Sequence, residues 1–225
     1  MPVEYKADDV LTAAQKRTAR VFDEFSRVVA SVSSGKDSTV LYHLALTEAE
    51  KRDRRVEVFF LDQEAEYEST VELIGSMMRH PLVDPRWVQA PLYMTNATSH
   101  KSYFLHAWGP GENWMRQKDP IAIHEFPGHP DRFYQFFPWF ESQAQEPTAW
   151  LIGLRSKESF NRFRAVTTRA GYRGWSWSTK TKSPLSFRFY PIYDWTFGDV
   201  WKYIVDAGRP TTVTMTACLQ START

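Results

Sequence analysis

The sequence has very little cysteine: Cys218 is the single one among 225 residues. A lone thiol excludes an intramolecular disulfide framework and any site built from several cysteines, so we expect no multi-cysteine zinc site and no iron–sulfur cluster. Long apolar runs are also missing, and none approaches the roughly 18 residues that cross a bilayer. The first 20 residues carry acids where an export signal needs an apolar core. We therefore expect a cytoplasmic protein with no membrane partner.

An excess of charge of one sign is absent too. Lys and Arg number 28 against 26 Asp and Glu, a formal net charge of +2, and so small a surplus does not indicate a nucleic-acid partner. Aromatic residues are plentiful at 15%, with nine tryptophans. They either fill a large core or line a surface for flat ligands or a protein partner, and composition does not separate these uses.

Short apolar runs alternate with segments of helical periodicity. Because parallel strands are joined through helices, this alternation predicts an α/β fold with a mainly parallel, twisted sheet and helices on both faces. Asp8 or Asp9 and Thr196 are the expected N-caps of the first and last helices. The expected strands are 28–32, 56–61, 86–90, 149–153 and an edge strand at 187–192, and the later expected helices are 39–46, 67–79 and 196–205.

Residues 1–210 are predicted to form a single domain. Within it, residues 92–145 break the alternation, and we expect an irregular insertion over one end of the sheet that is rich in aromatics and holds His100, His106, His124 and His129. These histidines lack the spacing of metal ligands. The segment 211–225, with many threonines and few large apolar residues, is expected to be a disordered or truncated tail.

The most informative segment is the loop Ser33-Ser34-Gly35-Lys36-Asp37-Ser38, between an expected strand and an expected helix. Phosphates bind well at such a junction, because backbone N–H groups are free there and the helix dipole favours negative charge. The glycine allows close backbone approach, and the lysine and hydroxyls add donors. Ala30 and Asp37 depart from the P-loop pattern, so a P-loop kinase or GTPase is excluded. The plainer alternative is a polar turn that caps a helix.

The loop resembles the Ser-Gly-Gly-Lys-Asp-Ser loop of the PP-loop ATP pyrophosphatase superfamily, with Ser34 in place of the first glycine. Three further segments are similar to the phosphoadenosine phosphosulfate (PAPS) reductase branch, and together with the loop they cover about residues 28–205. They are Phe59-Phe60-Leu61-Asp62 with Glu64 and Tyr67, then 153–162 (Gly-Leu-Arg-Ser-Lys-Glu-Ser-Phe-Asn-Arg), and then 191–196 with 199–204.

The resemblance implies an adenine-nucleotide site, with ATP or PAPS as the ligand. Arg155 and Arg162, seven residues apart, are expected to share a helix face and to bind phosphate or sulfate oxygens, and Glu158 to orient one of them. The alternative is a solvated helix face with an i,i+4 pair between Glu158 and Arg162. The predicted nucleotide-binding residues are Ser33, Ser34, Gly35, Lys36, Asp37, Ser38, Asp62, Gly153, Arg155, Glu158, Ser159 and Arg162.

The acidic residues Asp62, Glu64, Glu66 and Glu68 have two interpretations. Their oxygens suit a magnesium ion that accompanies ATP, or they form a solvated helix N-terminus favoured by the dipole. We predict no resident metal site. In the motif at 191–196, Asp194 is expected to cap a helix and Trp195 to pack in the core.

The reductases use a cysteine near the C-terminus, in a Glu-Cys-Gly-x-His context, as the nucleophile. Cys218 has no neighbouring Glu, Gly or His, so that motif is absent and no catalytic residue is assigned. Three functions remain open. The first is a PAPS reductase-like protein acting on a phosphosulfate or phosphoanhydride. The second is an ATP-dependent adenylating enzyme for sulfur transfer or nucleic-acid modification, and the third an inactive nucleotide-sensing regulator with a protein partner on the aromatic insertion. The oligomeric state is left open.

Overall fold

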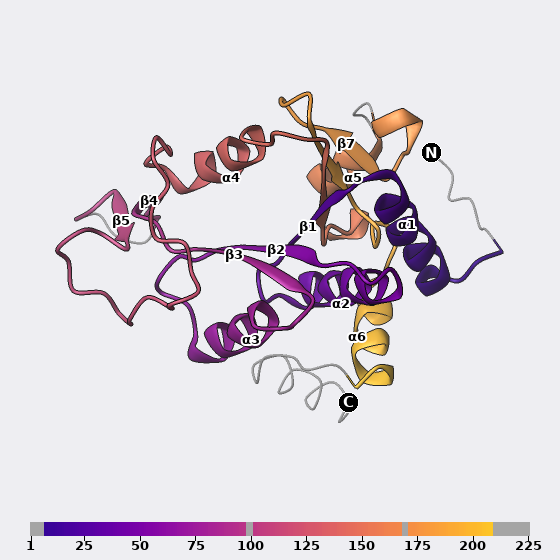
Figure 1. Cartoon of the computed structure of the whole chain (residues 1–225), viewed down its shortest axis with the longest axis horizontal. Helices are drawn as coiled ribbons and strands as arrows, with labels where there is room; N and C mark the ends of the chain where they lie inside the picture. The colour runs from indigo at the N-terminus through magenta and orange to yellow at the C-terminus, as the bar shows by residue number, and fades with distance from the viewer. Residues whose placement is uncertain (1–6, 98–100, 168–170, 209–225) are drawn as a thin grey trace.

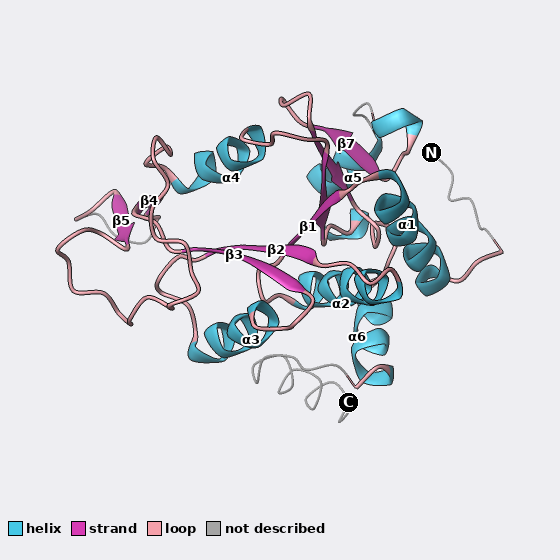
Figure 2. Cartoon of the chain, viewed as in Figure 1, coloured by secondary structure: helices cyan, strands magenta, loops and turns pink. Residues whose placement is uncertain are grey.

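The computed structural model describes residues 7–97, 101–167 and 171–208 (Figure 1). Helices and strands alternate through most of this range, as Figure 2 shows. The helices are α1 (Val10–Glu24), α2 (Lys36–Lys51), α3 (Glu68–Met78), α4 (Phe133–Ser142), α5 (Phe160–Thr167) and α6 (Phe197–Asp206), with short 3-10 turns η1 (Ser156–Glu158) and η2 (Tyr172–Gly174). The strands are β1 (Arg27–Ser31), β2 (Val56–Leu61), β3 (Val83–Val88), β4 (Leu92–Thr95), β5 (Phe104–Ala107), β6 (Thr148–Ile152), β7 (Ser178–Lys180) and β8 (Ser186–Phe189).

Six strands form the main sheet, in the order β3-β2-β1-β6-β8-β7. All neighbours pair in parallel except β7 and β8, which are antiparallel. The predicted α/β class with a mostly parallel sheet is therefore confirmed. The prediction of an edge strand at 187–192 was wrong, because β8 lies between β6 and β7, and the short strand β7 forms that edge.

The two faces of the sheet are covered by different helices (Figure 1). Side chains alternate along β1, so that Val28 and Ala30 pack in a cluster with residues of α2 and α3, whereas Val29 packs in a cluster with α4. This alternation buries both faces of β1, which explains why its sequence is a continuous apolar run rather than an alternating one.

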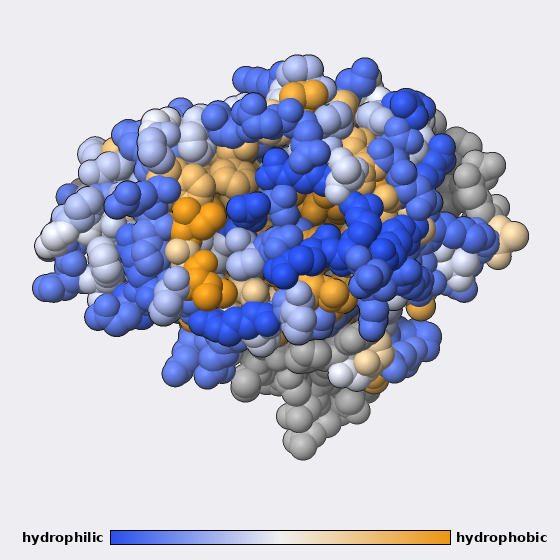
Figure 3. Space-filling model, in the orientation of Figure 1, coloured by the Kyte–Doolittle hydropathy of each residue, from blue (hydrophilic) through white to orange (hydrophobic). Residues whose placement is uncertain are grey.

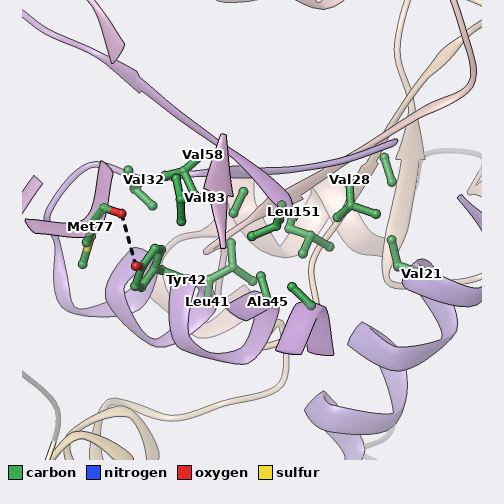
Figure 4. Close-up of a cluster of buried hydrophobic side chains, with 14 of the residues drawn as sticks. Val21, Val28, Val32, Leu41, Tyr42, Ala45, Val58, Met77, Val83 and Leu151 are labelled. Carbon is green, nitrogen blue, oxygen red and sulfur yellow. Dashed lines mark hydrogen bonds between the residues drawn. The ribbon is translucent and has the colours of Figure 1, made fainter. Parts of the chain in front are cut away.

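Helix α2 is buried along most of its length because it packs on three sides. Leu41 and Ala45 face the sheet, and Val40 and Leu44 face α1 and α6. The Tyr42 hydroxyl donates to the Met77 carbonyl of α3 at 3.3 Å, and Figure 4 shows this bond at the edge of the apolar cluster. The helix that carries the phosphate-type loop is thus held rigidly.

The first and last helices begin where the sequence predicts. Asp9 caps α1 by accepting the Thr12 N–H at 2.8 Å. Thr196 caps α6, and Asp199 accepts from the Thr196 N–H at 2.7 Å to complete a capping box.

The segment 92–145 contains regular elements within its long loops. Strands β4 and β5 form an antiparallel pair, and α4 lies on the sheet face opposite α2. Phe136 of α4 is fully buried there. The expected tail at 211–225, with Cys218, lies outside the described residues, as does His100. No helix in the described ranges is both long and apolar enough to span a membrane.

Candidate functional site

The loop 33–38 lies where the strand order reverses. From β1 the chain proceeds outward through β2 and β3, then returns to place β6 on the other side of β1. In open parallel sheets a crevice forms at this switch point, beyond the carboxyl ends of the two strands, and ligands bind there. Here the loop 33–38 follows β1 and the segment 153–155 follows β6, so two motifs far apart in the sequence meet at one edge.

The loop folds tightly around its own hydroxyls. Ser38 Oγ accepts from the Ser33 N–H at 3.1 Å and donates to the Gly35 carbonyl at 2.9 Å. Ser34 has a left-handed backbone, with φ of 56°, and its hydroxyl donates to Thr70 Oγ1 at 3.2 Å. This conformation favours glycine, the residue at this position in the Ser-Gly-Gly-Lys-Asp-Ser loop that the chain resembles. Serine adopts it at a cost of roughly 1 kcal/mol.

The N-terminus of α2 is open towards this edge. Its N-cap, Gly35, supplies no side chain to accept from the N–H groups of the first turn. These groups and the positive end of the helix dipole therefore lie at the carboxyl edge of the sheet. Lys36 begins the helix, and its Nζ lies 5.4 Å from the centre of the Phe197 ring of α6. Phe197 was not singled out from the sequence, since nothing there indicates that α6 begins beside the loop.

Gly153, the residue after β6, lies against the backbone of the loop. A Cβ built on it would lie 2.9 Å from Asp37 C and from Ser38 N, closer than real Cβ atoms come to backbone. Only glycine fits here without a shift of one segment. The segment that follows β6 is consequently in direct contact with the first turn of α2.

Five side chains form a continuous chain of alternating charge across the site. Asp37 accepts from Lys36 Nζ at 3.1 Å and from Arg155 Nε at 2.8 Å. Glu158 lies 3.3 Å from Arg155 Nη2 and also pairs with Arg162. Three cations against two anions leave one net positive charge. Lys36 and Arg155 thus share one acceptor, the Asp37 carboxylate.

The two arginines do not share a helix face, so that expectation was wrong. Arg155 precedes the 3-10 turn η1, and Ser159 is in an extended conformation before α5 begins. Arg155 is 5% exposed and points to Asp37, whereas Arg162 is 46% exposed and makes the i,i+4 pair with Glu158 that the plainer alternative described. Ser159 Oγ accepts from the Arg162 N–H at 3.2 Å, at the start of α5.

Asp62 follows β2 and is surrounded by donors of the chain itself. Its carboxylate accepts from Trp87 Nε1 at 2.7 Å, from Gln89 Nε2 at 2.9 Å, and from the Arg116 guanidinium, and Asp62 is 1% exposed. Glu64 accepts from the backbone N–H of Met115 at 2.8 Å. In this structure both acids bind the segment 92–145 to the carboxyl end of β2. The sequence carried no signal for Arg116 as the partner.

Glu66 lies in the same acidic loop, between Glu64 and α3. Burial raises the pKa of its carboxyl group, and the charge of Asp62 raises it further, against a smaller lowering by Arg116. Among the residues that the structure describes, no group of three or more His, Cys, Asp or Glu side chains is arranged to hold a metal ion.

The motif at 191–196 contacts α1 and the turn that follows Arg155. Arg17 of α1 binds Asp194 through two bonds of 2.8 and 2.6 Å, so Asp194 is an ion-pair partner and not the expected helix cap. Trp195 is 1% exposed, as expected. The Tyr193 carbonyl accepts from the Ser156 N–H at 2.8 Å, which fixes the turn after Arg155.

Known proteins are similar to this chain over most of its length. The family model described as the phosphoadenosine phosphosulfate reductase domain matches residues 27–212. The chain belongs to this family. The Escherichia coli (strain K12) protein YbdN is 31% identical over 214 residues, and the chain, 87% of which aligns, spans about half (51%) of that protein. Adenosine 5′-phosphosulfate reductase of Oceanobacillus iheyensis is 22% identical over 205 residues, or 90% of this chain and 72% of that one.

Solved structures show the same fold. The Candida glabrata FMN adenylyltransferase in complex with FMN and the ATP analogue AMPCPP superposes with a TM-score of 0.55 at 14% identity, and covers 93% of this chain and 63% of that one. The same enzyme with FAD and inorganic pyrophosphate gives an equal score. At this identity the likeness concerns the fold alone, an α/β structure with a mainly parallel sheet.

Proposed function

We propose that this PAPS reductase-like chain binds an adenine nucleotide in the crevice between β1 and β6. In this proposal the protein acts on the phosphosulfate or phosphoanhydride group of that nucleotide. The observation that carries the proposal is the contact of Gly153 with the backbone of Asp37 and Ser38, because it joins two family motifs into one site at the switch point.

The loop is suited to the phosphate part of such a ligand. The first-turn N–H groups of α2 and the hydroxyl of Ser33 provide donors, and Lys36 provides a positive charge. Arg155 is too buried to swing outward, so we assign it to holding Asp37 and Lys36 in place. In this proposal Arg162, half exposed at the far end of the ion network, turns towards a phosphate or sulfate oxygen.

The test is a calorimetric titration of the full chain with PAPS, adenosine 5′-phosphosulfate and ATP, the last with and without magnesium. We expect saturable binding of at least one, and a loss of roughly 10- to 100-fold in affinity in Lys36→Ala, because a charge-assisted hydrogen bond is removed. Lys51→Ala is the matched control: Lys51 ends the same helix, about 22 Å away, and its loss should leave affinity unchanged.

Equal affinity in Lys36→Ala and Lys51→Ala would contradict a nucleotide site at the loop. Which nucleotide binds also separates the reactions. A preference for PAPS or adenosine 5′-phosphosulfate supports the reductase-like activity.

An ATP-dependent adenylating activity is the second candidate. The sequence supports it because the trio Lys36-Asp37-Ser38 is intact while no cysteine precedes residue 218, so residues 1–217 supply no thiol nucleophile. Release of pyrophosphate from ATP by the wild type, abolished in Lys36→Ala, would favour adenylation. Binding without turnover of any nucleotide would favour the sensing role, with the insertion as the surface for a protein partner.

A further inference from the structure

Positive charge is concentrated in one segment of the chain. Residues 147–193 contain nine Lys and Arg but a single acid, Glu158, whereas the rest of the chain contains 19 Lys and Arg against 25 Asp and Glu. The small net charge of +2 therefore conceals a basic segment within an acidic remainder. Such a segment attracts polyanions, because acids along the same stretch do not cancel its field. On the face in Figure 3, many of the most hydrophilic residues lie over the half of the molecule that holds α1, α5 and β7, and the last two elements belong to this segment.

The fold balances part of this charge and leaves the rest unbalanced. Four arginines of the segment pair with acids, as Arg155–Asp37, Arg162–Glu158, Arg173–Glu24 and Arg188–Glu141. Lys157, Lys180 and Lys182 are exposed, and among the described residues none of the three has an ion-pair partner. Lys157 lies three residues before α5, and β7, which lies beside α5 in Figure 1, ends at Lys180. The unpaired lysines thus belong to the immediate neighbours of α5.

Helix α5 itself exposes two aromatic rings. Phe160 is 72% exposed and Phe163 is 42% exposed. Residues three and four apart share a helix face, so Phe160, Phe163 and Arg164 lie on one side of α5. The guanidinium carbon of Arg164 lies 5.9 Å from the centre of the Phe160 ring. Exposed apolar rings rimmed by charge are typical of an interaction site rather than of a core.

We propose that α5 and its neighbouring lysines bind a single-stranded nucleic acid. In this arrangement the rings of Phe160 and Phe163 stack on unpaired bases. The three unpaired lysines contact the phosphates. The rings decide between a single strand and a duplex, because a duplex keeps its bases paired and stacked and offers no free base face. Charge complementarity and exposed rings together select this partner.

The surface is close to the candidate nucleotide site but separate from it. Five residues of chain lead from Arg155 to Phe160, so the Cα atoms of these two residues lie at most about 17 Å apart. A bound strand therefore passes near the edge of the sheet where the loop 33–38 lies. The inference goes beyond the proposed function, since it concerns a polymer and holds whether or not the loop binds an adenine nucleotide.

The test measures the binding of a fluorescein-labelled oligo-dT of about 12 nucleotides to the full chain by fluorescence anisotropy. We expect saturable binding that weakens between about 50 mM and about 200 mM salt, because counterions released from the phosphates contribute to the affinity. An oligomer of equal length without bases should bind at least about fivefold more weakly, because it offers nothing to stack on the rings. A duplex of equal length should also bind more weakly, and oligo-U shows whether RNA or DNA is preferred.

Two pairs of variants locate the site. Phe160→Ala should weaken binding by about fivefold or more, whereas Tyr134→Ala, which removes a ring 67% exposed on α4, should not change it. Lys157→Gln should lower the slope of log affinity against log salt by about 0.7, the share of one phosphate contact. Lys202→Gln, at 75% exposed on α6, should leave the slope unchanged. The proposal is overturned if Phe160→Ala binds like the wild type, or if the base-free oligomer or the duplex binds as tightly as the single strand.

Lys36→Ala separates this surface from the loop 33–38. The variant should keep its affinity for the oligonucleotide, because Lys36 is not part of the α5 surface. Loss of oligonucleotide binding in Lys36→Ala, with binding retained in Phe160→Ala, would put the strand in the loop and overturn the proposal. Oligonucleotide binding by a chain that binds no PAPS, adenosine 5′-phosphosulfate or ATP would contradict the proposed function alone.

Discussion

At the scale of single residues, Asp37 is the most constrained group of the candidate site. It is 12% exposed and it accepts from both Lys36 and Arg155, which come from different parts of the chain. The charge of Arg155, which is 5% exposed, is balanced by this carboxylate at 2.8 Å and by Glu158 at 3.3 Å. Asp37 therefore stabilises the fold at the loop where we propose that the phosphate part of the nucleotide binds.

We predict that Asp37→Asn lowers the free energy of unfolding by about 2–3 kcal/mol, because a hydrogen-bonded charge is removed from a buried guanidinium. Urea unfolding measures the change. Asp206→Asn is the matched control, since Asp206 and its partner Lys202 are 58% and 75% exposed, and the loss there should stay within about 0.5 kcal/mol. Equal losses in the two variants would show that Arg155 does not rely on Asp37.

At the scale of elements, the site depends on how closely two segments approach one another. Strand β6 pairs with β1 over five residues, which brings the segment after β6 beside the loop after β1. The absence of a side chain at Gly153 allows the last step of that approach. Gly198, in the first turn of α6, differs: the nearest atom to a Cβ there is Thr196 Oγ1 at 3.8 Å.

These two glycines form a matched pair of test positions. Gly153→Ala should lower the free energy of unfolding by about 1–3 kcal/mol and weaken nucleotide binding, because the added methyl group displaces the loop backbone. Gly198→Ala should be neutral or stabilising by up to about 1 kcal/mol, because alanine is the better helix former. Thermal unfolding and nucleotide titration measure the two effects. A Gly153→Ala protein as stable as Gly198→Ala would mean that the two segments have room to separate.

At the scale of the whole molecule, the segment 92–145 takes part in the core. Phe136 of α4 is 0% exposed and packs with Phe126, Trp139 and Phe140 over the sheet. Asp62 and Glu64, in the loop that follows β2, bind Arg116 and Met115 of the same segment. Most of its aromatic rings are thus used for packing, and the exposed ones include Tyr103 and Tyr134.

We predict that Phe136→Ala lowers the free energy of unfolding by about 3–5 kcal/mol, because it leaves a cavity between α4 and the sheet. Tyr134→Ala, on the same helix at 67% exposure, should change it by no more than about 0.5 kcal/mol. Chemical denaturation of both variants measures the difference. If both tolerate alanine equally, the segment is an appendage rather than part of the core.

The local patterns were enough to find most elements of the sheet. Local signals were enough to predict the strands at 56–61 and 149–153 and the helix after Thr196. The strands are buried apolar runs, and the helix begins with an N-cap followed by an acid. The edge strand at 187–192 was misplaced because pairing partners lie outside any sequence window. The prediction that Arg155 and Arg162 share a helix face was wrong for a related reason. Arg155 contacts Asp37 and Ser156 contacts Tyr193, and these long-range contacts hold the chain in a turn before α5 begins.

The sequence by itself determined the class of fold, the family and the composition of the loop 33–38, because strand and helix periodicity and motif spacing are properties of neighbouring residues. The tertiary structure alone decided which groups meet. It brought Gly153 against the loop, placed Arg155 on Asp37 rather than in open solvent, and paired Asp62 with Arg116. Such pairings depend on strand order and close packing, which bring residues more than 100 positions apart within hydrogen-bond distance.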